Sequence, residues 1–167
     1  MSDASMYQHD FTVLSTPEHV PIARRETTKI LTAWDIPEET ITLACLIVSE
    51  LVTNVVQHAA ILSPTATISL QHTAVDLALT VHDDHPHRPR ALPADYGSGG
   101  RGLLLVRTLV EEAGGTHEVT TTDPAERGKN ITVRLPHPPL MPPPSTMPSP
   151  PARASSASTC HGQRVVG

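Results

Sequence analysis

Aromatic residues are scarce in this sequence. They make up 2% of its 167 residues, while hydrophobic residues of all kinds reach 38%. That share suffices for a hydrophobic core, so the core must consist of Leu, Ile, Val and Ala side chains rather than rings. The length predicts one domain, with residues to spare for a tail.

Basic residues are not in excess either. The formal net charge is -5 and the sequence pI is about 6.0. Domains that bind nucleic acid usually carry a basic patch or stripe. Nothing in the charge therefore favours a direct nucleic-acid partner.

The sequence has only two cysteines, Cys45 and Cys160. Neither their number nor their spacing matches a disulfide framework or a zinc ribbon. Cys45 falls in an apolar helical run, so we expect it in the core. Cys160 falls in a segment with the composition of a tail.

No targeting or membrane-spanning segment is evident. The first residues contain no basic stretch followed by an apolar one, as a signal peptide would. No apolar run is close to the roughly 20 residues that cross a bilayer. We therefore expect a soluble, cytoplasmic protein with no membrane partner.

Proline is concentrated near the C-terminus. Nine of the 17 prolines lie between Pro136 and Pro151, mixed with Ser, Ala and Thr. Such a segment builds neither helix nor sheet and has little to bury. A passive tail is favoured over a proline-rich ligand for another domain. The expected organisation is a flexible N-terminus at 1–10, one domain at 11–136 and a Pro/Ser-rich disordered tail at 137–167.

Hydrophobic periodicity divides the domain into helices and strands. Pro17 and Pro37 each suit the first turn of a helix, and Gly114 suits a helix end. The sequence predicts helices at residues 17–34, 37–59 and 102–113. It predicts strands at residues 11–14, 67–71, 75–81, 117–121 and 131–135.

The order of these elements predicts a fold class. Strand, helix, helix, strand, strand, helix, strand, strand is typical of an α/β protein of the α+β two-layer sandwich type. Three helices would cover one face of a mixed, mostly antiparallel sheet. Residues 84–99 form a long loop, and loops of that length are usually functional or disordered.

Three polar residues share one face of the second predicted helix. Glu50, Asn54 and His58 are spaced four apart, which stacks them beside an apolar stripe. On periodicity alone, the simpler interpretation is that they border a buried face. The functional alternative is that Asn54 provides an oxygen to Mg²⁺ and Glu50 polarises a hydroxyl during phosphoryl transfer.

Asp83 ends a predicted strand and opens the long loop. Its carboxylate can accept a hydrogen bond from an exocyclic amine such as that of adenine. An aspartate that ends a strand and caps the next turn is common. This motif alone therefore decides nothing.

Glycines cluster before the third predicted helix, in GSGGRGL at residues 97–103. Backbone amides at such a helix start can approach phosphate oxygens, and the helix dipole favours the anion. The pattern is neither a Rossmann fingerprint nor a P-loop. A plain flexible connector is the alternative.

His and Asp residues cluster around the strand end at Asp83. Its members are His82, Asp83, Asp84, His85 and His87. No cysteine and no second cluster at a recognised zinc spacing accompanies them. Solvated loop residues are therefore favoured over a metal site.

The three motifs occur in an order that resembles one ATP-binding domain. DNA gyrase, the heat-shock and mismatch-repair ATPases and histidine kinases share this domain, and together form the GHKL superfamily. SELVTNVVQHA at residues 49–59 resembles the N box of that family almost residue for residue. VHD at 81–83 resembles its adenine-binding box, and GRGL at 100–103 resembles its phosphate-binding box.

The resemblance covers roughly residues 11–136. Gly128 and Lys129 are similar to the closing glycine motif of the family. The sequence is most similar to the single-domain subgroup of bacterial anti-sigma-factor serine/threonine kinases. The implied fold is the Bergerat-type ATP-binding fold, with ATP and Mg²⁺ as cofactors.

The resemblance implies a role for each matching residue. Asn54 would coordinate Mg²⁺, Glu50 would act as the catalytic base, and Asp83 would bind the adenine amine. The other implied nucleotide contacts are His58, Gly100, Arg101, Gly102, Leu103 and Gly128.

Two positions depart from the pattern of the family. Asp83 is followed by DHPH at residues 84–87, with no glycine before Gly97, whereas the family has a glycine soon after the aspartate. Lys129 follows Gly128 where a threonine is common.

The resemblance also implies a function. It points to an ATP-binding regulatory protein that phosphorylates a small anti-anti-sigma-like partner with Mg-ATP. The partners would be a sigma factor, an anti-anti-sigma protein or both, and a homodimer stays open. The alternative is a non-catalytic anti-sigma factor or adaptor in which nucleotide sets the conformation. A histidine kinase is less expected, since too few residues precede Phe11 for a dimerising helical pair.

Overall fold

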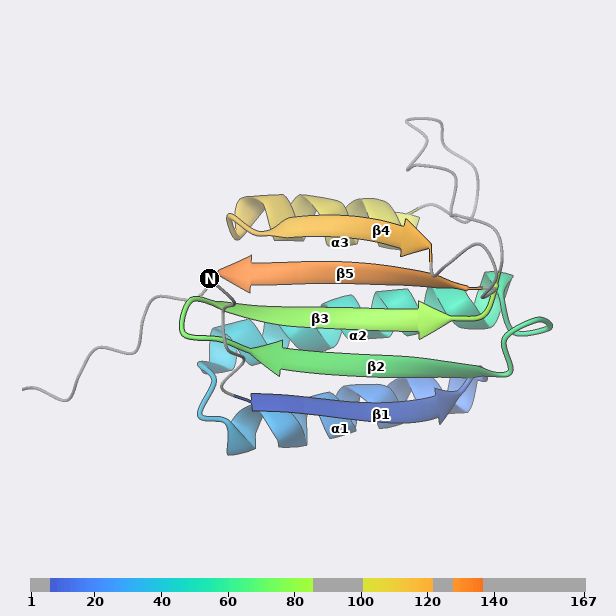
Figure 1. Ribbon diagram of the computed structural model, residues 1–167, viewed down its shortest axis with the longest axis horizontal. Helices are drawn as coiled ribbons and strands as arrows, with labels where there is room; N and C mark the ends of the chain where they lie inside the picture. Colours follow the sequence, from blue (N-terminus) through green and yellow to red (C-terminus); the bar gives the residue numbers. More distant parts are fainter. Residues whose placement is uncertain (1–6, 86–100, 122–127, 137–167) are drawn as a thin grey trace, which may run out of the picture.

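The computed structural model of the chain describes residues 7–85, 101–121 and 128–136 (Figure 1). Its elements in chain order are β1 (Tyr7–Leu14), the 3₁₀ turn η1 (Pro17–His19), α1 (Val20–Ala33), α2 (Glu38–His58), β2 (Thr65–His72), β3 (Asp76–Asp83), α3 (Arg101–Glu112), β4 (Thr116–Thr121) and β5 (Lys129–Pro136).

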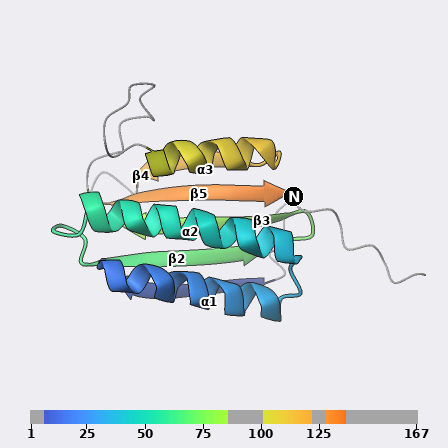
Figure 2. The ribbon, with the colours of Figure 1, turned by 180° about the vertical axis from the view of Figure 1, so that it is seen from behind.

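The molecule has two layers. The strands form one sheet in the order β1-β2-β3-β5-β4, and all three helices lie against the same face of it (Figures 1 and 2). The expected α+β two-layer sandwich is therefore confirmed. Every strand pairing in the described residues is antiparallel, which corrects the prediction of a mixed, mostly antiparallel sheet. β3 and β4 run in the same direction, but β5 inserts between them, so they form no parallel pair.

The buried core is aliphatic, as the shortage of rings predicts. All members of the buried cluster are Ala, Val, Ile or Leu, and the few rings, such as Phe11 and Trp34, pack only at its margin. Strand alternation supplies the sheet side of this core. In β2, Ala66, Ile68 and Leu70 point toward the helices and are fully buried.

The outer face of the sheet is polar. Cross-strand pairs hold it together, such as Thr12 with Thr67 (Oγ1 to Oγ1, 3.2 Å) and Thr80 with Thr132 (2.9 Å). An antiparallel sheet commonly buries one face and leaves the other to solvent. This alternation explains why threonine, a poor core residue, is frequent in these strands.

Helix α2 lies between α1 and α3 and runs the length of the sheet (Figure 2). Its buried residues include Ile47, Val48, Leu51, Val52 and Val55. By length and composition it is also the one described helix apolar enough to cross a membrane, with a mean hydropathy of 1.6 in its best window. This corrects the expectation that no apolar run approaches that length. A helix that packs on a sheet and on two other helices is apolar on more than one face. Its mean hydropathy can therefore match that of a membrane-spanning helix.

The two largest differences from the predicted element boundaries are at the starts of β1 and α1. β1 begins at Tyr7 rather than Phe11, because residues 7–10 continue the ladder with β2. There the Tyr7 ring stacks on that of Trp34, with a centroid distance of 5.7 Å. The first helix begins at Val20, since residues from Pro17 form a separate 3₁₀ turn. Cys45 is buried as expected, while Cys160 and the predicted tail lie outside the described residues.

Candidate functional site

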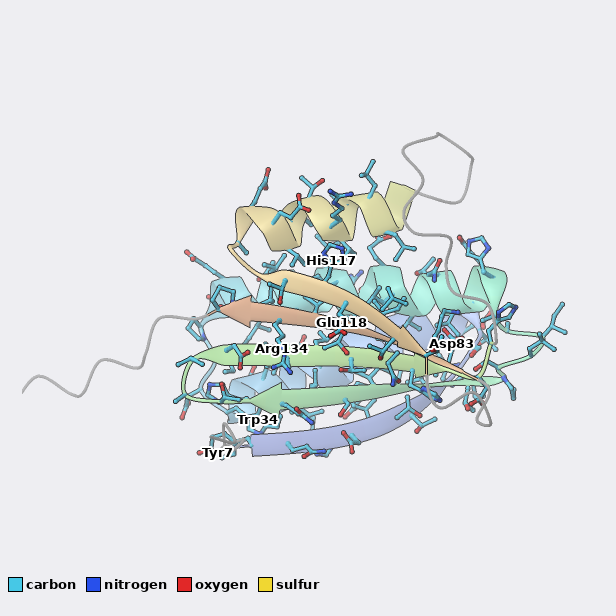
Figure 3. All side chains as sticks on the ribbon, turned by 45° about the horizontal axis from the view of Figure 1, so that its top comes forward. Tyr7, Trp34, Asp83, His117, Glu118 and Arg134 are labelled. Atoms are coloured by element: carbon cyan, nitrogen blue, oxygen red, sulfur yellow. The ribbon has the colours of Figure 1, made fainter. Side chains whose placement is uncertain are left out.

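Four chain segments converge at one end of the molecule. They are the last turns of α2, the end of β3, the start of α3 and the start of β5 (Figure 1). The antiparallel ladder places Asp83, the last residue of β3, opposite Lys129, the first residue of β5. Figure 3 labels Asp83 at this end, whereas Tyr7 and Trp34 lie at the opposite end of the sheet. Residues far apart in the sequence thus become neighbours here.

Glu50 lies against the first turn of α3. A Cβ atom added at Gly102 would collide with the Oε2 atom of Glu50, and would meet its Cδ at 3.4 Å. Glycine at this position leaves room for the carboxylate in its present place. A negative charge is also favourable at a helix N-terminus. A side chain at position 102 would therefore oblige the Glu50 carboxylate to move, a proximity that the glycine-rich pattern could not reveal.

Asn54 and His58 follow Glu50 along the same face of α2. Asn54 is half-buried and His58, in the last turn, is exposed. The neighbouring Ser49 points to the other side, where its Oγ accepts a hydrogen bond from Arg24 Nε of α1 (3.0 Å). The helix thus packs on α1 through one side and presents Glu50 and Asn54 toward α3 with the other.

Asp83 is almost completely buried, with 1% of its surface exposed. Its Oδ1 atom accepts two hydrogen bonds, one from Lys129 Nζ (2.9 Å) and one from the His85 amide (2.9 Å). Its Oδ2 atom is buried and has no hydrogen-bond partner among the described residues. An unpaired buried acceptor is costly. A ligand that gains access to this atom could supply the missing hydrogen bond.

Side chains hold the chain where it leaves β3. The amide of Asp84 donates to Ser63 Oγ (2.9 Å), and Ser63 in turn donates to the carbonyl of Thr65 (2.7 Å). His82 Nδ1 lies 2.8 Å from the side-chain oxygen of Asn130. These contacts fix the exit from β3 in a chain that has no glycine directly after Asp83.

A comparison with known protein families identifies the domain. The family model of the histidine kinase-like ATPase domain matches residues 13–135. The chain belongs to the histidine kinase-like ATPase domain family. Among solved structures, the mycobacterial sensor histidine kinase MprB is 26% identical over 57% of this chain and 74% of that chain, with a TM-score of 0.43. The comparison with curated proteins finds no match.

The residues of this histidine kinase-like ATPase domain fit an adenine nucleotide. The free Oδ2 acceptor of Asp83 suits the exocyclic amine of adenine. The first turn of α3, with Gly102, offers backbone amides that suit phosphate oxygens. The family membership and this donor and acceptor set together identify an ATP-binding domain.

The structure describes only some of the other predicted nucleotide contacts of the ATPase domain. Gly128 precedes β5 with a φ of 146°, which only glycine adopts easily. Leu103 is half-buried and packs against the core. Arg101 opens α3, but its side chain is not described, and Gly100 lies outside the described residues. Their contacts with nucleotide therefore stay predictions.

The His and Asp cluster after β3 forms no metal site among the described residues. His82 contacts Asn130 through one ring nitrogen and Asp84 (3.3 Å) through the other. Asp83 is engaged with Lys129. His87 lies outside the described residues.

Lys129 is the residue of this site that sequence reasoning noticed only as a departure from the family pattern. It is buried, with 4% of its surface exposed. Two-residue alternation places it on the same face of β5 as Ile131 and Val133, which are both buried. That alternation was the available signal for a buried lysine. The cross-strand register that brings it to Asp83 was not readable from either strand alone.

Proposed function

We propose that this ATP-binding domain is a serine/threonine protein kinase of the anti-sigma-factor type. It phosphorylates a small anti-anti-sigma-like protein in the cytoplasm, using Mg-ATP, and contacts neither nucleic acid nor membrane. The position of Glu50 carries this proposal. Its carboxylate lies at the glycine-opened start of α3, one helical turn from Asn54, so a base and a metal ligand share one face of α2.

The proposed roles follow from the chemistry of each side chain. Asp83 Oδ2 accepts the amine of the adenine ring and so orients the nucleotide. The Asn54 carboxamide offers an oxygen to Mg²⁺, which prefers few protein ligands together with waters and phosphates. Bound Mg-ATP supplies the phosphoryl group and the counter-charge for it.

Glu50 then acts on the incoming hydroxyl. A carboxylate within hydrogen-bond reach of a serine hydroxyl can take its proton as the oxygen attacks. The contact with the first turn of α3 restricts where this carboxylate can lie. Positioning of this kind lowers the cost of bringing the base and the hydroxyl together.

Replacement of Glu50 by glutamine tests this role. The amide has nearly the same shape but cannot accept the proton. Glu50→Gln is expected to bind ATP with an affinity close to that of the wild type, while phosphate transfer falls by about 10²–10⁴. The pure protein would be incubated with labelled ATP and with a partner isolated by affinity pull-down. Mass spectrometry would then locate the phosphoserine on that partner.

Glu39→Gln is the matched control, because Glu39 is exposed in the first turn of the same helix. It should leave transfer unchanged. Full transfer by Glu50→Gln would contradict the assigned role. A partner that binds in the presence of Mg-ATP but is never phosphorylated by the wild type would instead support the non-catalytic adaptor.

A further inference from the structure

An adenine site requires only the aspartate, yet here Asp83 forms a buried ion pair with Lys129. The Lys129 ammonium lies 2.9 Å from Asp83 Oδ1, and the two side chains are 6% and 1% exposed. Lysine is rarely buried unless it is paired. Burying both charges costs desolvation free energy, so a gain in stability does not by itself explain the pair.

The pair presents an acceptor and a donor side by side. Asp83 Oδ1 is occupied by Lys129 and by the His85 amide, while Oδ2 is buried and unpaired among the described residues. An ammonium has three N–H donors, and the hydrogen bond to Oδ1 uses one of them. Two N–H donors of this ammonium therefore remain beside the carboxylate that would bind the base.

We propose that Lys129 reads the purine base together with Asp83, so that the site accepts 6-oxopurine nucleotides as well as ATP. This inference rests on the proposed nucleotide site. A lone carboxylate accepts the amine of adenine and repels the carbonyl oxygen at the same position of hypoxanthine or guanine. The Lys129 ammonium donates to that oxygen, while Asp83 Oδ2 accepts the N1–H of the same ring.

A purely structural ion pair has a different consequence. If Lys129 only holds Asp83 in position, its removal displaces the carboxylate and weakens ATP at least as much as inosine triphosphate. If it reads the base, its removal weakens inosine triphosphate more. The ratio of the two dissociation constants therefore separates a specificity residue from a structural one.

Inosine triphosphate is the probe of choice, because hypoxanthine differs from adenine only where the two residues would contact the base. Dissociation constants for Mg-ATP and Mg-inosine triphosphate would be measured by calorimetry on the full chain. For the wild type, the dissociation constant for inosine triphosphate divided by that for ATP is expected to lie below about 10. In Lys129→Met it should rise by about tenfold or more, since a charge-assisted hydrogen bond is lost.

Two further variants keep the test decisive. Lys129→Gln retains an N–H donor without the charge, so it should give an intermediate ratio even where Lys129→Met fails to fold. Arg134→Met is the matched control, because Arg134 pairs with Asp76 across the same two strands (3.2 Å) but on the outer face of the sheet. It should leave the ratio unchanged.

The outcomes separate this inference from the function on which it rests. A wild type that binds neither nucleotide overturns both. ATP binding with a ratio above about 100 in the wild type overturns the inference alone, as does a ratio that neither Lys129 variant changes.

Discussion

The position of Gly102 shows how a single residue can influence where a carboxylate of the site lies. Glu50 occupies the volume that any Cβ at position 102 would need. The sequence predicted that this glycine serves phosphate binding through its backbone. The structure adds that it lies against the carboxylate on α2, a proximity that no pattern within residues 97–103 could show.

Gly102→Ala should therefore uncouple activity from stability. Alanine favours a helix over glycine by about 1 kcal/mol, so α3 itself gains stability. The methyl group nevertheless displaces the Glu50 carboxylate from its place beside the helix. Phosphate transfer is expected to fall at least about tenfold, while the thermal midpoint, followed by circular dichroism, changes by only a few degrees.

Thr108→Ala is the control for that substitution, since Thr108 is exposed on the same helix. It tests whether a gain in helix propensity alone affects transfer. Undiminished transfer by Gly102→Ala would show that the position of Glu50 is not critical.

At the scale of elements, α2 serves the core and the site at once. Leu51 is fully buried on the sheet side, and the adjacent Glu50 contacts the start of α3. Periodicity predicted this helix and its apolar stripe correctly, because a spacing of 3.6 residues is a local property of the sequence. It could not tell which polar positions would be covered, since this depends on where α1 and α3 dock.

Leu51→Ala tests the core role of α2. Removal of a fully buried leucine side chain is expected to lower the free energy of unfolding by about 2–5 kcal/mol, as measured by urea denaturation. Gln57→Ala, at an exposed position of the same helix, should change it by less than about 0.5 kcal/mol. A small loss for Leu51→Ala would mean that α2 is not packed on the sheet as described.

At the scale of the whole molecule, the fold class was predictable and the composition of the site only partly so. The order of elements determined the layers, and the motifs singled out Glu50 and Asn54 on α2 and Asp83 at the end of β3. The pairing of β3 with β5 was not predictable, because register depends on contacts between distant segments. For this reason Lys129 entered as a departure from a pattern rather than as the partner of Asp83.

The same antiparallel arrangement explains why one end of the molecule collects the polar groups. β3 ends and β5 begins there with Asp83 and Lys129, and α2 ends there too (Figure 1). The core stays aliphatic along the rest of the sheet. A ligand that binds at this end therefore contacts elements from both halves of the chain.

The most direct test of the account is a calorimetric titration of ATP with and without Mg²⁺. The wild type is expected to bind ATP about tenfold or more tightly with Mg²⁺, a difference of about 1.4 kcal/mol. Asn54→Ala should lose this gain, whereas Thr42→Ala, exposed on the same helix, should keep it. An equal effect of Mg²⁺ on the wild type and on Asn54→Ala would contradict the assignment of Asn54 as the metal ligand of an ATP site.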